Sequence, residues 1–145
     1  MIANYSPIRV AQVDSVEEII SYFPRLVALV KNDQAGVRAE DLLQLFLTCL
    51  RSGGVFVARD DHGLCGSCLV EMTSEEVAVL RLLPRETSQG VTKMCLTKIR
   101  EWGQKNGICE LRVCAFKMNG STFRYFEKTL GFYRQSVIFS MNLNG

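Results

Sequence analysis

The chain has 145 residues, of which 48% are hydrophobic and 22% charged, and 17 Lys and Arg residues against 15 Asp and Glu residues give a net charge of +2. This balance is typical of a globular domain and disfavours a disordered chain, a collagen-like repeat or a coiled-coil rod. The charge is too small to indicate a nucleic-acid groove or a polybasic membrane surface. No apolar run approaches the ~20 residues that cross a bilayer, and residues 1–10 lack the pattern of a secretory signal peptide. We therefore expect one cytoplasmic domain over residues 1–145 that binds neither nucleic acid nor membrane.

The first predicted elements are a strand and a helix. Residues 8–13 alternate apolar and polar side chains, which predicts a short strand. Ser15 and Glu18 have the spacing of a capping box, in which the hydroxyl and the glutamate satisfy backbone N–H groups at a helix start. Because Pro24 lacks an N–H group, we expect this helix to stop or bend there, with a second helical piece to about Lys31.

The middle of the chain changes from helical to strand periodicity. A broad apolar stripe over residues 39–51 predicts a helix, which Gly53 and Gly54 end. Three short β runs with polar turns between them follow, over residues 55–59, 64–72 and 77–83. Such short links predict an antiparallel meander.

The C-terminal half returns to mixed structure. Apolar residues recur at helical spacing over 91–102, Gly107 ends that helix, and residues 108–116 read as a strand. A strand, a helix and a strand in this order imply a right-handed parallel crossover. A last helix over 119–130 and one or two closing strands over 132–143 complete the chain. The predicted class is α+β: a mixed, mostly antiparallel sheet of six to seven strands with helices on both faces.

The six cysteines include one close pair, Cys65 and Cys68, with the CxxC spacing of redox sites and of half a zinc site. A redox pair needs a thiol at a helix N-terminus, whereas this pair falls in a predicted strand. A structural zinc site needs four ligands, the other cysteines form no second close pair, and the single histidine, His62, lies in a turn-like segment. We expect ordinary strand thiols and no metal, with redox sensing or metal binding as the alternatives.

Two motifs stand out in this order of elements: LLPRETSQGVT over residues 82–92, and Asn119 followed by YFEKTLGF over residues 125–132. Together they resemble the GNAT superfamily of acyl-CoA-dependent N-acyltransferases. In that family a strand leads into a helix through Val-x-Pro-x-x-Arg/Gln-x-x-Gly-x-Gly/Ala, and residues 82–92 keep its proline-to-glycine spacing. The second family motif is an Asn that starts a helix ending in Tyr-Glu-Lys-Leu-Gly-Phe. Here it corresponds to Asn119 followed by YFEKTLGF over residues 125–132. The resemblance covers most of the chain and implies a GNAT-like fold, acetyl-CoA as acyl donor and a primary amine as acceptor.

The first motif implies a site for the coenzyme. A helix N-terminus offers backbone N–H groups and a favourable dipole to a pyrophosphate, and glycine lets the backbone approach the phosphate oxygens. By the resemblance, the strand end would lie beside the pantetheine arm and Asn119 would hydrogen-bond it, although Asn119 serves equally well as a helix N-cap. The residues expected at the coenzyme are Leu82, Leu83, Thr87, Ser88, Gln89, Gly90, Val91, Thr92, Asn119 and Phe126.

This chain departs from the family pattern at two positions of the coenzyme motif. Thr87 stands at the Arg or Gln position, which removes one charge-assisted contact of roughly 1.5–3 kcal/mol. Thr92 stands at the last Gly or Ala position, where its hydroxyl could donate to phosphate. Arg85 or Lys93 could supply the missing positive charge.

The predicted chemistry is attack of a neutral amine on the thioester carbonyl, which requires a base, oxyanion stabilisation and a proton for the leaving thiolate. Many family members use a tyrosine of the last motif as the acid, but Phe126 occupies the matching position here, and Tyr125 beside it is our candidate acid. Ring packing is the alternative role of Tyr125. The glutamates considered as bases are Glu71, Glu76 and Glu110, each of which is otherwise a solvated charge.

The sequence defines the acceptor amine less closely than it defines the coenzyme. In the family the first helices and their connecting loop grip it, which corresponds here to about residues 22–41, with Asp33, Glu40 and Asp41 as candidate amine ligands. An amino acid, a polyamine, an aminoglycoside, a peptide N-terminus and a protein lysine all remain open, as do a monomer and a homodimer. Two other functions stay in view: a GNAT-fold module that binds acyl-CoA or a protein without turnover, and an unrelated α+β interaction domain.

Overall fold

The computed structural model describes residues 7–33, 36–84, 90–113, 124–133 and 141–143. The chain divides into two compact units, residues 1–114 and 115–145, which are described separately. Among the described residues, the first unit holds the sheet and three α-helices, and the second holds one short helix. The single domain over residues 1–145 stays a prediction.

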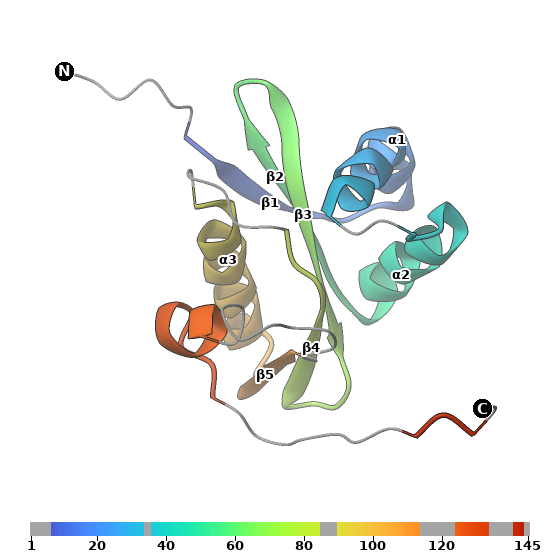
Figure 1. Ribbon diagram of the computed structural model, residues 1–145. Coiled ribbons are helices and arrows are strands. Elements are labelled where there is room, and N and C mark those ends of the chain that lie inside the picture. The colour runs from blue at the N-terminus through green and yellow to red at the C-terminus, as the bar shows by residue number, and fades with distance from the viewer. Residues whose placement is uncertain (1–6, 34–35, 85–89, 114–123, 134–140, 144–145) are drawn as a thin grey trace. The chain divides into compact units, whose positions relative to one another are not determined.

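Five strands form one sheet in the order β1-β2-β3-β4-β5 (Figure 1). Neighbouring strands are antiparallel except for β4 and β5, which are parallel, so the predicted meander and the crossover through a helix are confirmed. The strands are β1 (Arg9–Val13), β2 (Gly53–Asp60), β3 (Gly63–Met72), β4 (Val77–Leu82) and β5 (Glu110–Val113). The helices are α1 (Val16–Asp33), α2 (Ala39–Ser52), α3 (Val91–Lys105) and the π-helical η1 (Tyr125–Thr129).

The mixed α+β class with helices on both faces is confirmed, but the expected six to seven strands are not: the described residues contain five. The closing strands were expected over 132–143, where the described residues 132–133 and 141–143 are not in strands and 134–140 lie outside the described part. The strand expected over 108–116 is also shorter. Cys109 donates its N–H to the Glu76 carbonyl at 2.8 Å before β5 begins, and residues 114–116 are not described.

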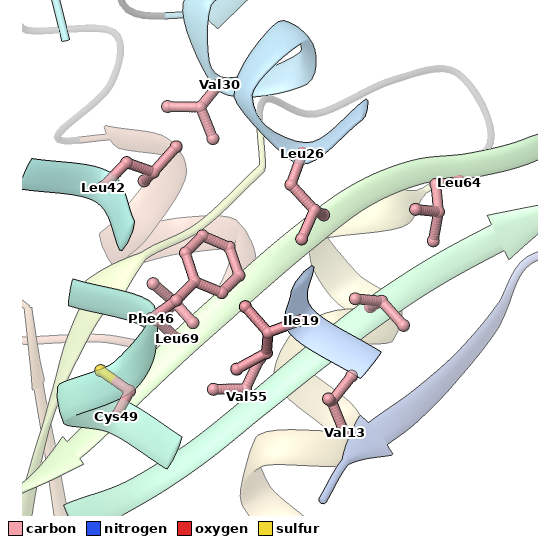
Figure 2. Packing of buried hydrophobic residues seen from close by; sticks show 11 residues of the cluster. Val13, Ile19, Leu26, Val30, Leu42, Phe46, Cys49, Val55, Leu64 and Leu69 are labelled. Carbon is pink, nitrogen blue, oxygen red and sulfur yellow. The ribbon is translucent and has the colours of Figure 1, made fainter. Parts of the chain in front are cut away.

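Helices α1 and α2 cover one face of the sheet and build the larger core with it (Figures 1 and 2). Residues of β2 alternate, so that Val55 and Val57 face this core while Phe56 lies on the opposite face. Phe46 of α2 is fully buried and meets the Phe23 ring edge-on, with the ring centroids 6.4 Å apart. The buried members of the core are Val13, Ile19, Leu26, Val30, Leu42, Phe46, Cys49, Val55, Val57, Leu64 and Leu69.

Helix α3 covers the other face, over β1, β2 and β3. Its buried side chains recur three or four residues apart, which is the spacing of a helix face. Trp102 packs edge-on against Phe56, with ring centroids 6.5 Å apart, and the thiol of Cys95 lies within hydrogen-bonding reach of Cys68 on β3. Helices therefore cover both faces of the sheet over β2 and β3.

Helix α1 contradicts the expected stop at Pro24, because it runs from Val16 to Asp33 with Pro24 inside; the alternative, a bend at Pro24, stays a prediction. Pro24 and Ile20, whose carbonyl loses its hydrogen-bond donor, are both exposed, so water can reach that carbonyl. Leu26 and Val30 are buried on the sheet side and hold the second half of the helix in place. The Ser15 half of the predicted capping box is confirmed, since the Glu18 N–H donates to Ser15 Oγ at 3.2 Å; the return bond from the Glu18 side chain stays a prediction.

Candidate active site

The connection between β4 and α3 contains the first motif. Strand β4 ends at Leu82, Leu83 and Pro84 follow, and Gly90 directly precedes α3. Leu82 and Leu83 are half-buried. The predicted coenzyme residues Thr87, Ser88 and Gln89 lie outside the described residues, as does Asn119.

Gly90 has the backbone conformation for which the sequence motif requires glycine. Its φ of 76° and ψ of 34° fall in the left-handed region, which other residues rarely adopt. A Cβ atom placed there would meet no described atom within 4 Å. The N–H of Met94 donates to the Gly90 carbonyl at 3.1 Å, so the helix begins at Gly90. No acidic side chain occupies the first turn of α3, which is described in full, and its positive dipole end is not neutralised there.

Both sides of this connection are anchored on β3. A Cβ atom at Gly66 would lie 3.1 Å from Pro84 Cβ and 3.3 Å from Val91 Cγ2, so the absent side chain lets the strand end and the helix start pack closely on β3. Thr92 adds a hydrogen bond: its Oγ1 donates to the Pro84 carbonyl at 2.9 Å, and its side chain is buried. The Thr92 hydroxyl is therefore used within the protein, and a role for Thr92 at a phosphate would rest on its backbone.

Strand β4 contains a β-bulge. Val70 of β3 pairs with Leu80 and the preceding Leu69 pairs with Leu82, which leaves Arg81 as the extra residue. On its other side, the described pairing of β4 with β5 runs from Val77 to Leu80, and the residues that follow Val113 lie outside the described part.

Arg81 forms an ion pair with Glu71 of β3, with Arg81 Nε 2.8 Å from Glu71 Oε1. The two side chains are 39% and 23% exposed, respectively. They lie near the buried thiol of Cys49 at the end of α2. The pKa of Cys49 is raised from 9.0 to about 11, first by burial and then by the Glu71 carboxylate, while the Arg81 guanidinium opposes the rise. The ion pair is therefore on the α1 and α2 face of the sheet, beside the bulge.

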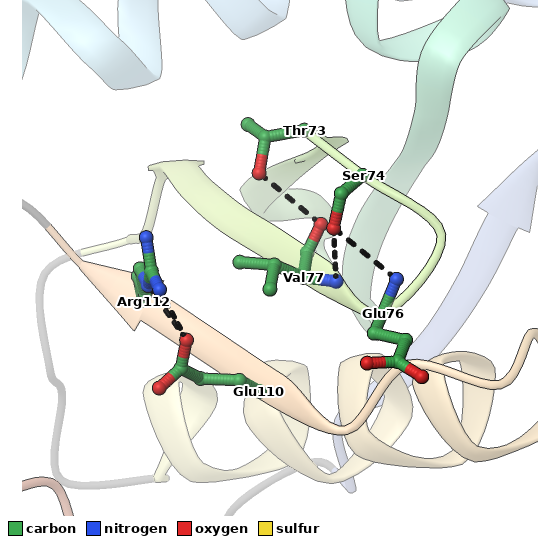
Figure 3. Close-up of polar contacts among 6 residues, drawn as sticks. All are labelled: Thr73, Ser74, Glu76, Val77, Glu110 and Arg112. Carbon is green, nitrogen blue, oxygen red and sulfur yellow. Dashed lines mark hydrogen bonds and ion pairs between the residues drawn. The ribbon is translucent and has the colours of Figure 1, made fainter.

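The other two candidate bases lie at the opposite end of the β4–β5 pair (Figure 3). Glu76 is exposed in the turn before β4, where its N–H donates to Ser74 Oγ at 3.3 Å. Glu110 starts β5 opposite Val77 and forms an ion pair with Arg112 at 2.7 Å. Of the three glutamates, only Glu71 is beside the bulge.

The second motif lies in the second unit. Residues 125–129 form a π-helix, which holds more residues per turn than an α-helix and so accommodates the extra Thr129 relative to the family pattern. The Phe126 ring is half-buried and packs against Phe132, with centroids 5.5 Å apart and planes at 62°. The Phe132 N–H donates to the Phe126 carbonyl at 2.9 Å. The side chain of Tyr125 is not described, so its predicted role as acid stays a prediction.

The CxxC pair lies in β3, as expected. Cys65 is half-buried and is the extra residue of a second bulge, since Ala58 pairs with Gly66 and Arg59 with Leu64. Cys68 is fully buried, and burial together with the neighbouring Cys95 raises its pKa well above 9.0. Burial also raises the pKa of Cys65. Raised pKa values keep these thiols protonated and weakly nucleophilic. No group of three metal-ligating side chains occurs among the described residues.

The candidate acceptor residues are not brought together in the described part. Glu40 forms an exposed ion pair with Arg38 at 3.5 Å, Asp41 is exposed, and the side chain of Asp33 is not described. Sequence reasoning missed Arg81. Counting residues outward from the turn at 73–76 along both strands would have placed Arg81 in the neighbourhood of Glu71. The direct contact could not have been predicted, because it depends on a bulge in the pairing of two strands.

The sheet order, the helices on both faces and the β4–α3 connection define the fold of the GNAT acetyltransferases. The aminoglycoside N-acetyltransferase AAC(6')-Iy in complex with CoA superposes with a TM-score of 0.72 and 19% identity, over 99% of both chains. An aminoglycoside acetyltransferase from an uncultured soil metagenomic sample, in complex with sisomicin, has a TM-score of 0.66 and 21% identity over 94% of this chain and 96% of that one.

An acetyltransferase from Streptococcus agalactiae has a TM-score of 0.67 and 12% identity, over 92% of both chains. No family model matches the sequence, and no curated protein sequence matches it. At these identities the likeness shows the fold. In the part of the chain that the structure describes, no helix is long and apolar enough to span a membrane.

Proposed function

We propose that the protein is an acetyl-CoA-dependent N-acetyltransferase that acetylates a primary amine. The observation that carries this proposal is the β4–α3 connection, in which a bulged strand ends at Leu82, Pro84 follows, and a left-handed Gly90 precedes the helix. The same connection carries the sequence motif that resembles the coenzyme site of the GNAT family. Solved acetyltransferases of the same fold contain CoA, which supports acetyl-CoA as the donor.

The residues at this connection fit a coenzyme. A pyrophosphate needs backbone donors, a positive dipole and space, and the start of α3 provides the dipole, with no described atom within 4 Å of a Cβ at Gly90. The end of β4 is where the amides of a pantetheine arm would add to the sheet as a strand does. When bound, acetyl-CoA supplies an activated thioester carbonyl.

The residues of this chain would position the acyl donor and supply the proton for the leaving thiolate. The backbone of 82–83 and the start of α3 would orient the donor, and Tyr125 would protonate the leaving thiolate because Phe126, at the family's tyrosine position, has no proton to give. The packing of Phe126 against Phe132 is the specific observation that favours a second candidate, a GNAT-fold module that binds acyl-CoA without turnover.

Two measurements test the proposal. Saturating acetyl-CoA should raise the melting temperature, since a ligand at a hundred times its Kd adds about 2.7 kcal/mol to the free energy of unfolding. Free thiol released from acetyl-CoA in the presence of amines then separates turnover from binding. No melting shift with millimolar acetyl-CoA would contradict the proposal, and a shift without thiol release over a broad amine panel would favour the binding module.

Loss of the candidate acid should slow only the chemical step. Tyr125→Phe should lower kcat by ~10²-fold or more with little change in acetyl-CoA affinity. The matched variant Phe126→Tyr restores the family's tyrosine and should raise kcat if that position reaches the sulfur. An unchanged rate in Tyr125→Phe would leave its ring with a packing role.

A further inference from the structure

We infer that helix α1 docks against α1 of a second copy of this chain, in antiparallel orientation about a two-fold axis. The surface involved is an exposed apolar ridge of α1, which consists of Val16, Ile20, Pro24 and Ala28. The inference concerns how copies of the chain associate, and it is independent of the proposed acetyl transfer.

The ridge is separate from the residues by which α1 packs on the sheet. Its four members are spaced four residues apart, so they follow one row along the helix surface, and each is exposed. Ile20 is 61% exposed and Val16 is 43% exposed, whereas Ile19, Leu26 and Val30 are buried in the core. A row of this spacing is the one that most commonly packs into the groove of a like row on another helix.

The charges of α1 fit a second copy of the same helix. Glu17 and Glu18 lie in its first turn, while Arg25 and Lys31 lie in its second half. All four side chains are exposed, and among the described residues none of them forms an ion pair. An antiparallel pair sets the acidic start of each helix against the basic half of the other, whereas a parallel pair opposes like charges. A partner with one sign of charge would be repelled by one half of the helix.

The position of the two-fold axis follows from the ridge. An axis near its middle sets Ile20 of each chain against Pro24 of the second copy and brings Glu17 within reach of Arg25 of that copy. Because every contact then occurs twice, the interface is closed and association stops at a dimer. The 18 residues of α1 span about 27 Å. A single pair of such helices buries an area at the low end for protein interfaces, so we expect a Kd in the micromolar range or weaker.

The first test is the mass of the full chain in solution. Sedimentation equilibrium from about 1 μM to about 1 mM covers the expected range of Kd. The average mass should rise from that of one chain towards that of two chains and then level off. A single chain over the whole range would overturn the inference, as would continued growth beyond two chains.

A substitution in the middle of the ridge tests where the copies meet. Ile20→Glu places a charge at the centre of the interface and should raise the Kd of the dimer by about 30-fold or more, as loss of a central contact does. The matched control is Met94→Glu, since Met94 is 40% exposed but lies on α3, which covers the other face of the sheet (Figure 1). Met94→Glu should leave the Kd unchanged. An unchanged Kd in Ile20→Glu, or an equal rise in both variants, would overturn the inference.

Charge reversal tests the antiparallel orientation. Glu17→Arg and Arg25→Glu should each raise the Kd about ten-fold, because each places like charges together twice across the axis. A mixture of the two single variants should form a mixed dimer with the affinity of the parent, since every reversed charge then faces an opposite one. Native mass spectrometry distinguishes the mixed dimer when one variant is labelled with ¹⁵N. A loss of affinity that came from a weakened helix would persist in the mixture, and absence of the mixed dimer would overturn the antiparallel pairing.

Discussion

At Gly90 the left-handed backbone conformation, with no described atom within 4 Å of a Cβ, determines the effect of adding a side chain. In Gly90→Asp the left-handed φ of 76° costs about 1–2 kcal/mol of stability at most, and the protein has no described atom within 4 Å for the new Cβ to strike. A bound phosphate would meet both the side chain and its negative charge. We therefore expect acetyl-CoA binding to be lost while the chain still folds, as measured by calorimetry and circular dichroism.

Two further variants isolate the cause. Gly107 has a φ of 73° after the end of α3 and likewise no described atom within 4 Å of a Cβ, so Gly107→Asp should lose a similar amount of stability and bind acetyl-CoA normally. Thr87→Arg restores the family's guanidinium and should tighten binding by roughly 1 kcal/mol, since an exposed charge is screened. Acetyl-CoA affinity that is unchanged in Gly90→Asp would place the phosphate elsewhere.

The buried hydroxyl of Thr92 provides a second prediction at the residue scale. Thr92→Val keeps the shape of the side chain but leaves the Pro84 carbonyl without this donor, which should lower the free energy of unfolding by about 1–3 kcal/mol. Thr92→Ser retains the hydroxyl and should lose less. Urea unfolding of both variants checks this, and equal losses would show that the methyl group, and not the hydrogen bond, is what matters.

At the scale of elements, α1 carries a proline in its exposed middle without breaking. Its buried residues on the sheet side compensate for the lost hydrogen bond, as Leu26 and Val30 show. Pro24→Ala should therefore stabilise the protein by about 2 kcal/mol, because the ~3 kcal/mol cost of a mid-helix proline is partly offset by the greater entropy of the unfolded chain. Urea unfolding measures the change, and Ala28→Gly in the same exposed surface should shift it the other way. A destabilised Pro24→Ala would mean that the proline ring itself is packed.

The elements that local patterns encode were predicted well. The Ser15 cap, the meander over 55–83 and the helix that follows the proline–glycine motif depend on neighbours in sequence, and all are present. The continuity of α1 could not be predicted, because tertiary packing overrides the local effect of Pro24. The bulge at Arg81 was also missed, since a bulge exists only in the pairing of two strands, and with it the ion pair to Glu71.

At the scale of the whole molecule, the buried thiols link stability to alkaline pH. The folded protein holds the Cys49 proton up to a pKa of about 11, whereas an unfolded thiol loses it near 9.0, and the pKa values of Cys65 and Cys68 are raised as well. Between these values the folded state binds more protons than the unfolded state, so the free energy of unfolding falls as pH rises. Each thiol contributes at most ~1.4 kcal/mol per pH unit.

Urea unfolding under reducing conditions from pH 8 to 11 measures this slope. Cys49→Val, which keeps a buried apolar side chain of similar size, should reduce the slope between pH 9 and 11 by up to one thiol's share. A slope that is unchanged in this variant would mean that Cys49 titrates alike in both states.

The packing of Pro84 and Val91 on Gly66 bears on which substitutions the protein can tolerate in the segment between them, residues 85–89. The two ends of the 85–89 segment are held by β3 and by the Thr92 hydrogen bond, and none of these anchors lies within the segment itself. The contacts that hold the start of α3 on β3 are therefore separate from residues 85–89. We expect substitutions within this segment to change ligand affinity more than the free energy of unfolding, so that ligand preference can evolve while the scaffold is maintained.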